Sequence, residues 1–257
     1  ERNILVSIDI NCDMGEGFGV YKIGEDEEII KYVTSANIAC GFHAGDPRWM
    51  RNSVLLAENN NVSIGAHPGY PDLIGFGRRN MTIPTDQIVD DVTYQIGALT
   101  AFTTAKKLQH VKPHGAMYNQ AVNDDEQAKA ICSAILSAQP DSILLALSGS
   151  RWINIADSMG LKVAKEVFAD RALNPDGTLV SRSVQGAVIS DISEVIDRSL
   201  RVATEGKMMA IDGTLLSIEA DSICIHSDTL GAGKMAKSLN EAFISENISI
   251  RPISEII

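Results

Sequence analysis

Seven short hydrophobic runs alternate along this sequence with segments of helical periodicity. The runs cover residues 5–12, 36–41, 62–66, 110–113, 143–147, 162–168 and 222–226. Most are nearly continuous rather than alternating, which is typical of strands buried on both faces of a parallel sheet. The helical segments cover residues 25–33, 48–59, 85–107, 124–138, 151–159, 192–205 and 233–245. This alternation predicts an α/β fold.

Polar residues and glycines follow almost every hydrophobic run. In a closed β/α barrel the carboxyl ends of all strands meet at one face, which carries the active site, whereas an open sheet spreads them along a crevice. Contributions from nearly every strand end therefore favour a (β/α) barrel with seven strands. We see no linker and expect one domain over residues 1–257, with residues 70–84 and 170–186 as active-site loops.

Charge and composition exclude several classes of protein. The chain has 33 acidic and 22 basic residues, a formal net charge of -11, which disfavours nonspecific binding to nucleic acids and anionic membranes. Its four cysteines form no CxxC pair, so we expect buried free thiols. Neither a signal-peptide pattern nor an apolar run of membrane-spanning length is visible. We expect a soluble cytoplasmic protein that binds neither nucleic acid nor membrane.

Four of the five histidines follow predicted strands. They are His43, His67, His114 and His226, whereas His110 stands at a strand start, where a structural or surface role is expected. A single buried histidine is usually only hydrogen-bonded. Four at equivalent strand ends are harder to explain structurally, and histidine is the usual general acid or base near neutral pH. We therefore expect these four side chains near one mouth of the barrel.

Three charged residues at strand ends allow both a functional and a structural interpretation. Asp13 and Glu16 could cap the next helix, or they could serve as a general base or metal ligand. Lys112 lies in an apolar run, where an unpaired charge is costly. It either forms a buried salt bridge with a neighbouring strand or presents a cation to an anionic substrate.

Two glycine-rich segments resemble nucleotide-binding motifs but are incomplete. The segment 231–235 lacks the P-loop glycine, since Asp228 stands there, and has Met235 in place of serine or threonine. The segment 15–20 lacks the third glycine of a dinucleotide fingerprint. Neither a GxSxG nucleophile elbow nor an HExxH zinc motif occurs.

Several long segments resemble the LamB/YcsF family. They are IDINCDMGEGFG (8–19), VTSANIACGFHAGDP (33–47), IGAHPGYPDLIGFGRR (64–79), QIGAL (95–99), VKPHGAMYN (111–119), DRALNPDGTLVSR (170–182) and IHSD (225–228). The resemblance covers essentially the whole chain. It implies a barrel related to those of polysaccharide deacetylases and glycoside hydrolases. It also implies the activity of the A subunit of bacterial 5-oxoprolinase, which opens 5-oxo-L-proline to L-glutamate with ATP.

The same resemblance implies companion B and C subunits, which carry the ATP-dependent activation. Phosphorylating the lactam oxygen makes a better electrophile, and a general base must then activate water. The residues expected in catalysis are Asp13, His43, His67, Lys112 and His114. The residues expected to bind substrate, including a phosphorylated intermediate, are Asn11, Glu16, Gly17, Arg79, His226 and Asp228.

Two other functions stay open at this stage. A metal-dependent deacetylase-like hydrolase would use Asp13, His43 and His67 around a divalent ion, although no paired His-x-x-x-His is present. A noncatalytic carrier of a small carboxylated ligand would need the cationic groups but no acid or base. The identity of any metal is not fixed by the sequence.

Overall fold

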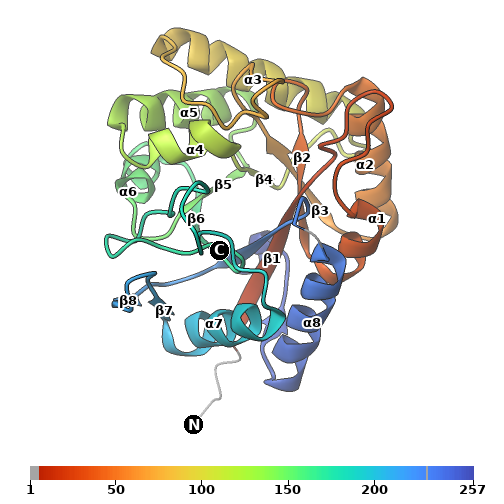
Figure 1. Cartoon of the computed structure of the whole chain (residues 1–257). Helices are drawn as coiled ribbons and strands as arrows, with labels where there is room; N and C mark the ends of the chain where they lie inside the picture. The colour runs from red at the N-terminus through yellow and green to blue at the C-terminus, as the bar shows by residue number, and fades with distance from the viewer. Residues whose placement is uncertain (1–5, 230) are drawn as a thin grey trace.

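Seven parallel strands form a closed barrel in the computed structural model, which describes residues 6–229 and 231–257. They are β1 (Ser7–Met14), β2 (Ser35–Ala39), β3 (Ser63–His67), β4 (His110–Val111), β5 (Ile143–Leu147), β6 (Val163–Phe168) and β9 (Ser222–His226). Neighbours pair in the order β1-β2-β3-β4-β5-β6-β9, and β9 pairs with β1 to close the ring (Figure 1). The predicted barrel is confirmed; the predicted start of its first strand, residue 5, lies outside the described residues.

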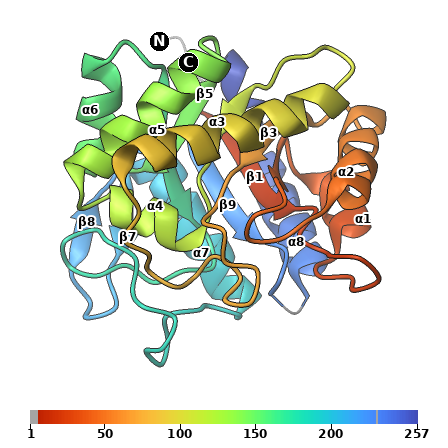
Figure 2. The ribbon, with the colours of Figure 1, turned by 90° about the horizontal axis from the view of Figure 1, so that it is seen from above.

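The helices lie outside the ring of strands (Figures 1 and 2). They are α1 (Asp26–Ile29), η1 (Ile30–Tyr32), α2 (Pro47–Asn59), α3 (Thr85–Phe102), α4 (Gly115–Ala121), α5 (Asp125–Ala138), α6 (Arg151–Ser158), α7 (Ile192–Glu205) and α8 (Ala232–Ser245). Side chains of Asp46, Asp124 and Asp191 accept hydrogen bonds from the first turns of α2, α5 and α7. These caps satisfy amide groups that have no partner within the helix, which explains why the helices begin there.

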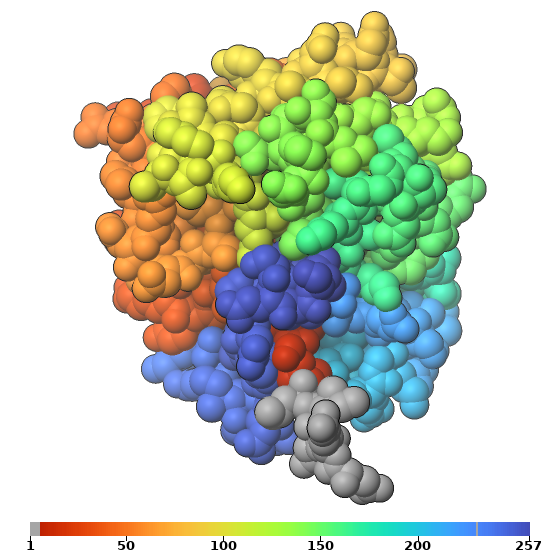
Figure 3. All heavy atoms as spheres, turned by 180° about the vertical axis from the view of Figure 1, so that it is seen from behind, coloured from red at the N-terminus to blue at the C-terminus, as the bar shows by residue number. Residues whose placement is uncertain are grey.

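The C-terminal segment closes the amino end of the barrel. Strand β10 (Ser249–Ile250) pairs in parallel with the start of β1, and the turn η2 (Ile253–Glu255) follows it. Ile253 is fully buried in a small cluster with Ile143, Leu145 and Ala164, from the beginnings of β5 and β6. Seen from behind, this segment (dark blue) lies near the centre of its face (Figure 3). The open mouth is therefore at the carboxyl ends of the strands.

The described residues contain five elements that the sequence did not predict. They are α4, β10, η2, and the strands β7 (Lys207–Met209) and β8 (Leu215–Ser217), which form an antiparallel hairpin. The helix expected at 85–107 ends earlier, at Phe102, because Thr103 is extended. Strand β4 is short because Pro113 has no amide hydrogen for the ladder, although the amide of Lys112 still donates to the carbonyl of Ala66 (2.9 Å).

The interior of the barrel is polar, although its strands read as hydrophobic runs. Alternate residues of β1 point inward, and Asp9, Asn11 and Asp13 are all buried. Asp9 accepts hydrogen bonds from Thr34, Ser35 and Ser222 at the lowest level. Burial, only partly offset by these hydroxyls, raises the pKa of Asp9 to about 6.

The middle level of the interior is an amide and imidazole network. The Asn37 amide donates to Asn11 Oδ1 (2.7 Å), and His110 Nε2 donates to Asn37 Oδ1 (2.7 Å). The His110 ring has room because β3 carries Gly65 opposite, where a Cβ would lie 2.1 Å from the ring. Burial, with the charge of Lys112 adding to it, lowers the pKa of His110 to about 3. His110 thus has the structural role expected of it.

Among residues 6–229 and 231–257, no helix combines the length and the hydrophobicity that crossing a bilayer requires. All four cysteines are buried and free, as predicted.

Candidate functional site

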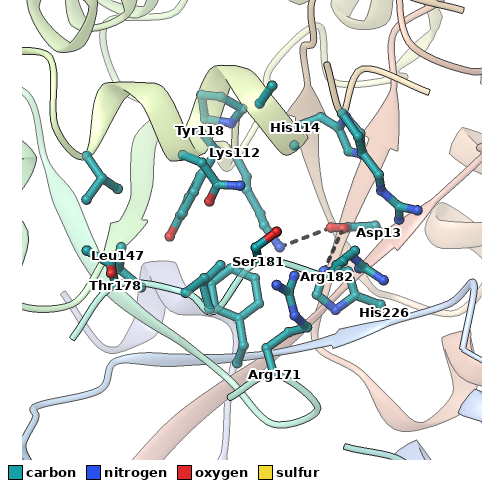
Figure 4. A pocket seen from close by; sticks show the side chains of 18 of the residues that line it. Asp13, Lys112, His114, Tyr118, Leu147, Arg171, Thr178, Ser181, Arg182 and His226 are labelled. Atoms are coloured by element: carbon teal, nitrogen blue, oxygen red, sulfur yellow. Dashed lines mark hydrogen bonds and ion pairs between the residues drawn. The ribbon is translucent and has the colours of Figure 1, made fainter. Parts of the chain in front are cut away.

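A cavity of about 410 Å³ opens at the carboxyl ends of the strands. Five residues proposed from the sequence line it: Asp13, His67, Lys112, His114 and His226. The segment 178–182, between β6 and α7, covers one side of it, and α4 covers another (Figure 4). The cavity lies within the size range of small-molecule sites and at the face where β/α barrels carry their active sites.

Lys112 is paired with two buried carboxylates at the floor of this cavity. Its Nζ lies 3.0 Å from Asp13 Oδ1 and 2.9 Å from Glu166 Oε1, and all three side chains are at most 5% exposed. Burial alone would lower the pKa of Lys112, but the carboxylate of Asp13 outweighs it and holds this pKa well above its ordinary value. The ammonium ion is therefore permanently charged, and it both pairs with carboxylates and faces the cavity.

Asp13 is the most connected group of the site. It belongs to β1 itself, the last residue but one of the strand, and not to the loop after it as the sequence suggested. Its Oδ2 lies 3.3 Å from His67 Nε2 and 3.9 Å from His226 Nε2. Burial alone would raise the pKa of Asp13, but His67 and Lys112 outweigh it and hold this pKa well below its ordinary value. Asp13 caps no helix, and it is ionised.

His226 forms a carboxylate–imidazole pair at the rim. Its Nδ1 donates to Asp170 Oδ1 (2.9 Å), which follows β6, and this fixes the tautomer so that Nε2 faces the cavity. Asp170 is buried, which by itself raises its pKa, but His226 outweighs burial and lowers it. The ring also stacks on Phe168 at a centroid distance of 5.5 Å. Such an oriented imidazole is the usual form of a general base.

A second group of imidazoles surrounds Glu16 behind the cavity wall. His43 Nε2 and His114 Nε2 lie 3.3 Å and 3.8 Å from Glu16 Oε1. The two rings stack with centroids 3.8 Å apart, and His67 meets His43 edge-on at 5.4 Å. Burial raises the pKa of Glu16 and lowers those of His43 and His114, each well beyond its ordinary value. One ligand atom from each of the four side chains lies within 4.8 Å of the others, a geometry that could hold a metal ion.

Two arginines that the sequence analysis did not propose line the cavity. The guanidinium of Arg171 is held by the carbonyls of Val180 (2.6 Å) and Ala187 (3.3 Å). Neither Arg171 nor Arg182 has a carboxylate within ion-pair distance in the part of the chain that the structure describes. Burial, with the nearby charge of Arg182, lowers the pKa of Arg171 to about 10. The carboxylate of Asp170 acts on both cations without forming an ion pair, an arrangement that could hold an anion.

A third arginine at the cavity, Arg78, does have a counter-charge. Its Nη2 lies 2.5 Å from Asp228 Oδ2. Asp228 does not itself line the cavity, so its proposed role in binding substrate becomes one of holding Arg78.

Some residues proposed from the sequence lie away from the cavity. Arg79 points outward and pairs with Asp72, whereas its neighbour Arg78 lines the cavity. Gly17 packs under Trp49, where a Cβ would lie 2.5 Å from the indole. Asn11 is buried below Asp13 and donates to Glu166 (3.0 Å). None of these three residues lines this cavity, and their proposed contact with substrate stays a prediction.

The prediction that four histidines share one mouth is confirmed. His67, His114 and His226 line the cavity, and His43 stacks directly on His114. The set Asp13, His43 and His67, expected for a deacetylase-like metal site, is not the group that assembles. Glu16 and His114 join His43 and His67 instead, and Asp13 groups with Cys224 and His226.

Fold and site together define a β/α-barrel protein with ionisable side chains at its mouth and two arginines on the wall of its cavity. Residues 8–257 match the LamB/YcsF family. The chain belongs to the LamB/YcsF family.

Curated relatives match over their whole length. The chain is 50% identical to the 5-oxoprolinase A subunit of Pyrococcus horikoshii over 252 residues, which covers 97% of this chain and 99% of the relative. It is 51% identical to the 5-oxoprolinase A subunit of Clostridium beijerinckii over 254 residues, covering 98% of this chain and all of the relative (100%).

Solved structures agree with this assignment. The lactam utilization protein from Thermus thermophilus superposes with a TM-score of 0.90 at 42% identity, covering 95% of this chain and 99% of that one. A T48 deacetylase with substrate superposes with a TM-score of 0.51 at 12% identity, covering 98% of this chain and 90% of that one. This second likeness concerns the fold alone and shows that the deacetylase has a barrel of similar architecture.

Proposed function

We propose that this chain is the A subunit of an ATP-dependent 5-oxoprolinase, and that it opens the ring of 5-oxo-L-proline to give L-glutamate. The observation that carries the proposal is the full-length identity of about 50% to proteins of that name. The cavity supports it independently, because it combines an oriented imidazole, an ionised carboxylate and unpaired arginines. These are the groups that hydrolysis of an anionic lactam needs.

Arg171 and Arg182 are suited to bind the anionic parts of the substrate. 5-Oxoproline carries a carboxylate, and phosphorylation of the lactam oxygen would add a second anionic group. Two cations that form no ion pair match such a ligand, since guanidinium groups bind carboxylate and phosphate strongly. The segment 178–182 also brings the neutral hydroxyl of Ser181 to the wall of the cavity.

ATP is used, in this proposal, by the companion B and C subunits rather than by this chain. The P-loop-like segment is incomplete at Asp228 and Met235. The amide of Gly233, which a phosphate would need at the start of α8, already donates to Glu25 Oε2 (3.0 Å). The lactam would thus arrive activated, and this chain would carry out the attack of water and the opening of the ring.

His226 is the best-placed base for that attack. His226 Nε2 and Asp13 Oδ2 lie 3.9 Å apart. A water molecule to one side of the line that joins them can lie about 2.8 Å from both atoms and form a hydrogen bond with each. His226 would take a proton as the water oxygen bonds to the ring carbonyl carbon, and Asp170 would stabilise the resulting imidazolium ion. As the ring C–N bond breaks, the same imidazolium would return the proton to the departing nitrogen. This leaves the former lactam carbonyl as an acyl phosphate, and a second water molecule would displace its phosphate to give L-glutamate and inorganic phosphate.

Asp13 is less suited to be the base than the sequence suggested. A carboxylate whose pKa lies well below its ordinary value has little tendency to take a proton from water. Its proposed role is to orient the water through Oδ2 while Oδ1 holds Lys112. Lys112 would then face the developing negative charge.

The direct test is a glutamate-release assay with 5-oxoproline and ATP. We expect turnover only when the chain is combined with both companion subunits, because an unactivated lactam reacts very slowly with water. Robust ATP-driven turnover by the purified chain alone would contradict the division of labour. No glutamate from the assembled subunits would contradict the proposed reaction.

A further inference from the structure

We propose that Glu16, His43, His67 and His114 form a binding site for one divalent transition-metal ion. The inference goes beyond the proposed reaction and does not depend on it. It rests on where the fold places four side chains, on the second contact of one of them, and on the kinds of ligand they supply.

Four adjacent strands each deliver one of these side chains to the same point. Glu16 follows β1, His43 follows β2, His67 is the last residue of β3, and His114 follows β4 as the residue before α4. One ligand atom of each lies within 4.8 Å of the other three. Ligands at about 2.0–2.2 Å from a tetrahedral ion lie roughly 3.3–3.6 Å apart. The distances from Glu16 Oε1 to His43 and His114, 3.3 Å and 3.8 Å, are already close to that value.

His67 has the second contact typical of a metal ligand. Its Nδ1 donates to the carbonyl of Lys112 (2.6 Å), so Nε2 carries the lone pair whenever the ring is neutral. That Nε2 is buried and has no hydrogen-bond partner among the described residues. His67 Nε2 lies 3.3 Å from Asp13 Oδ2. The lone pair of this nitrogen would face the negative carboxylate, an unfavourable contact unless a proton or a cation lies nearby. A metal ion at the centre of the cluster would supply that cation.

Two glycines hold the other rings in place. A Cβ at Gly69 would lie 2.6 Å from His43 Nδ1, and one at Gly77 would lie 2.7 Å from His114 Nδ1. Gly77 also has a positive φ of 63°, a conformation that other residues rarely adopt. The backbone thus packs against the Nδ1 edges and directs both Nε2 atoms towards Glu16.

The ligand set determines the kind of ion. Three imidazole nitrogens and one carboxylate oxygen suit Zn²⁺, Fe²⁺ or Co²⁺, whereas Mg²⁺ and Ca²⁺ prefer oxygen ligands. The other group of ligand type, Asp13, Cys224 and His226, is a poorer candidate because Lys112 Nζ already lies 3.0 Å from Asp13 and 2.9 Å from Cys224. His67 and His114 line the cavity, so an ion here would lie directly behind its wall.

The experiment is metal binding by the full chain, without companion subunits or substrate. Chelator-treated protein is titrated with Zn²⁺ alone by calorimetry and with Co²⁺ alone by visible absorption, which reports the ligand geometry. We expect one ion per chain. Glu16→Gln keeps the shape of the side chain but removes a charged ligand, and it should weaken binding by at least about tenfold. His43→Asn should do the same.

The matched control is Asp26→Asn, which changes a buried carboxylate at the first position of α1. It accepts from the amide of Gly15 (2.8 Å), which asparagine can also do, and it belongs to no ligand group. The affinity of the Asp26→Asn variant for Zn²⁺ and Co²⁺ should stay within about threefold of that of the wild type. Circular dichroism checks that each variant is folded. The proposal is overturned if wild type binds neither ion, or if Glu16→Gln binds as tightly as wild type. It is also overturned if His226→Gln, and not Glu16→Gln, abolishes binding.

Discussion

Replacing Lys112 by methionine should destabilise the protein strongly. Methionine nearly matches the length of lysine but leaves Asp13 and Glu166 buried without their shared cation, which now lies 3.0 Å and 2.9 Å from them. At an effective dielectric constant of about 20, each contact contributes roughly 5 kcal/mol of Coulomb energy before the cost of desolvation. Breaking a buried ion pair from one side typically costs about 3–5 kcal/mol. For a chain of this size that corresponds to roughly 10 °C in melting temperature.

The loss should depend on pH in a definite direction. In the wild type the pKa of Asp13 is lowered, so its contribution to stability is present above the unfolded pKa and is lost only as pH falls through the folded value. In Lys112→Met the cation no longer offsets burial, so the pKa of Asp13 rises relative to wild type, although His67 still lowers it. Relative to wild type, the variant therefore loses most stability at high pH and recovers as Asp13 takes up a proton. The difference from wild type should be largest near pH 8 and should shrink towards about pH 4.

Urea unfolding followed by circular dichroism at both pH values measures these differences. Lys165→Met is the control, because that lysine pairs with Glu219 at the surface and should cost at most about 1 kcal/mol. The double variant Lys112→Met/Glu166→Gln removes one uncompensated charge and should recover more than about 1 kcal/mol. A loss below about 1 kcal/mol for Lys112→Met, or an equal loss at pH 8 and pH 4, would refute the electrostatic argument.

Three further predictions concern activity of the assembled enzyme, measured as glutamate release. His226→Gln should slow turnover by about 10²- to 10⁴-fold, because a positioned base is lost; activity within about threefold of wild type would eliminate it as the base. Arg182→Gln should raise KM by about tenfold or more with a smaller change in kcat, since an unpaired cation for the substrate is removed; an unchanged KM would contradict that role. Asp13→Asn should also lower kcat by about 10²-fold or more with folding intact, whereas full activity would favour a noncatalytic carrier.

Much of the architecture follows from local pattern alone. Each hydrophobic run corresponds to a barrel strand, because a largely apolar segment is stable only when both of its faces are covered. The grouping of His43, His67, His114 and His226 followed from the same reasoning, since parallel strands end at one face. That residues 1–257 form one domain stays a prediction.

The elements that the sequence missed are those without a local signal. Helix α4 has only seven residues, too few for a clear helical period. It begins directly after Pro113 and His114, the residues at which the chain leaves β4. Strands β7, β8 and β10 have two or three residues each, and their pairing partners are distant or on the same short hairpin. Such short segments are decided by tertiary contacts rather than by propensity.

Which charged residues meet was decided only by the tertiary structure. Arg78 and Arg79 are adjacent and chemically alike, but the loop before them turns through positive φ at Phe76 and Gly77, and only Arg78 reaches the cavity. Arg171 and Arg182 stand in a segment whose sequence predicts an active-site loop, but nothing local showed that both would line the cavity without an ion pair. The sequence alone was enough to locate the strands and the residues at their ends, because the hydrophobic pattern of a strand extends over only a few consecutive residues. The pairing of Lys112 with Asp13 and Glu166, and of Glu16 with three histidines, depends on ring closure between distant strands, which no local pattern records.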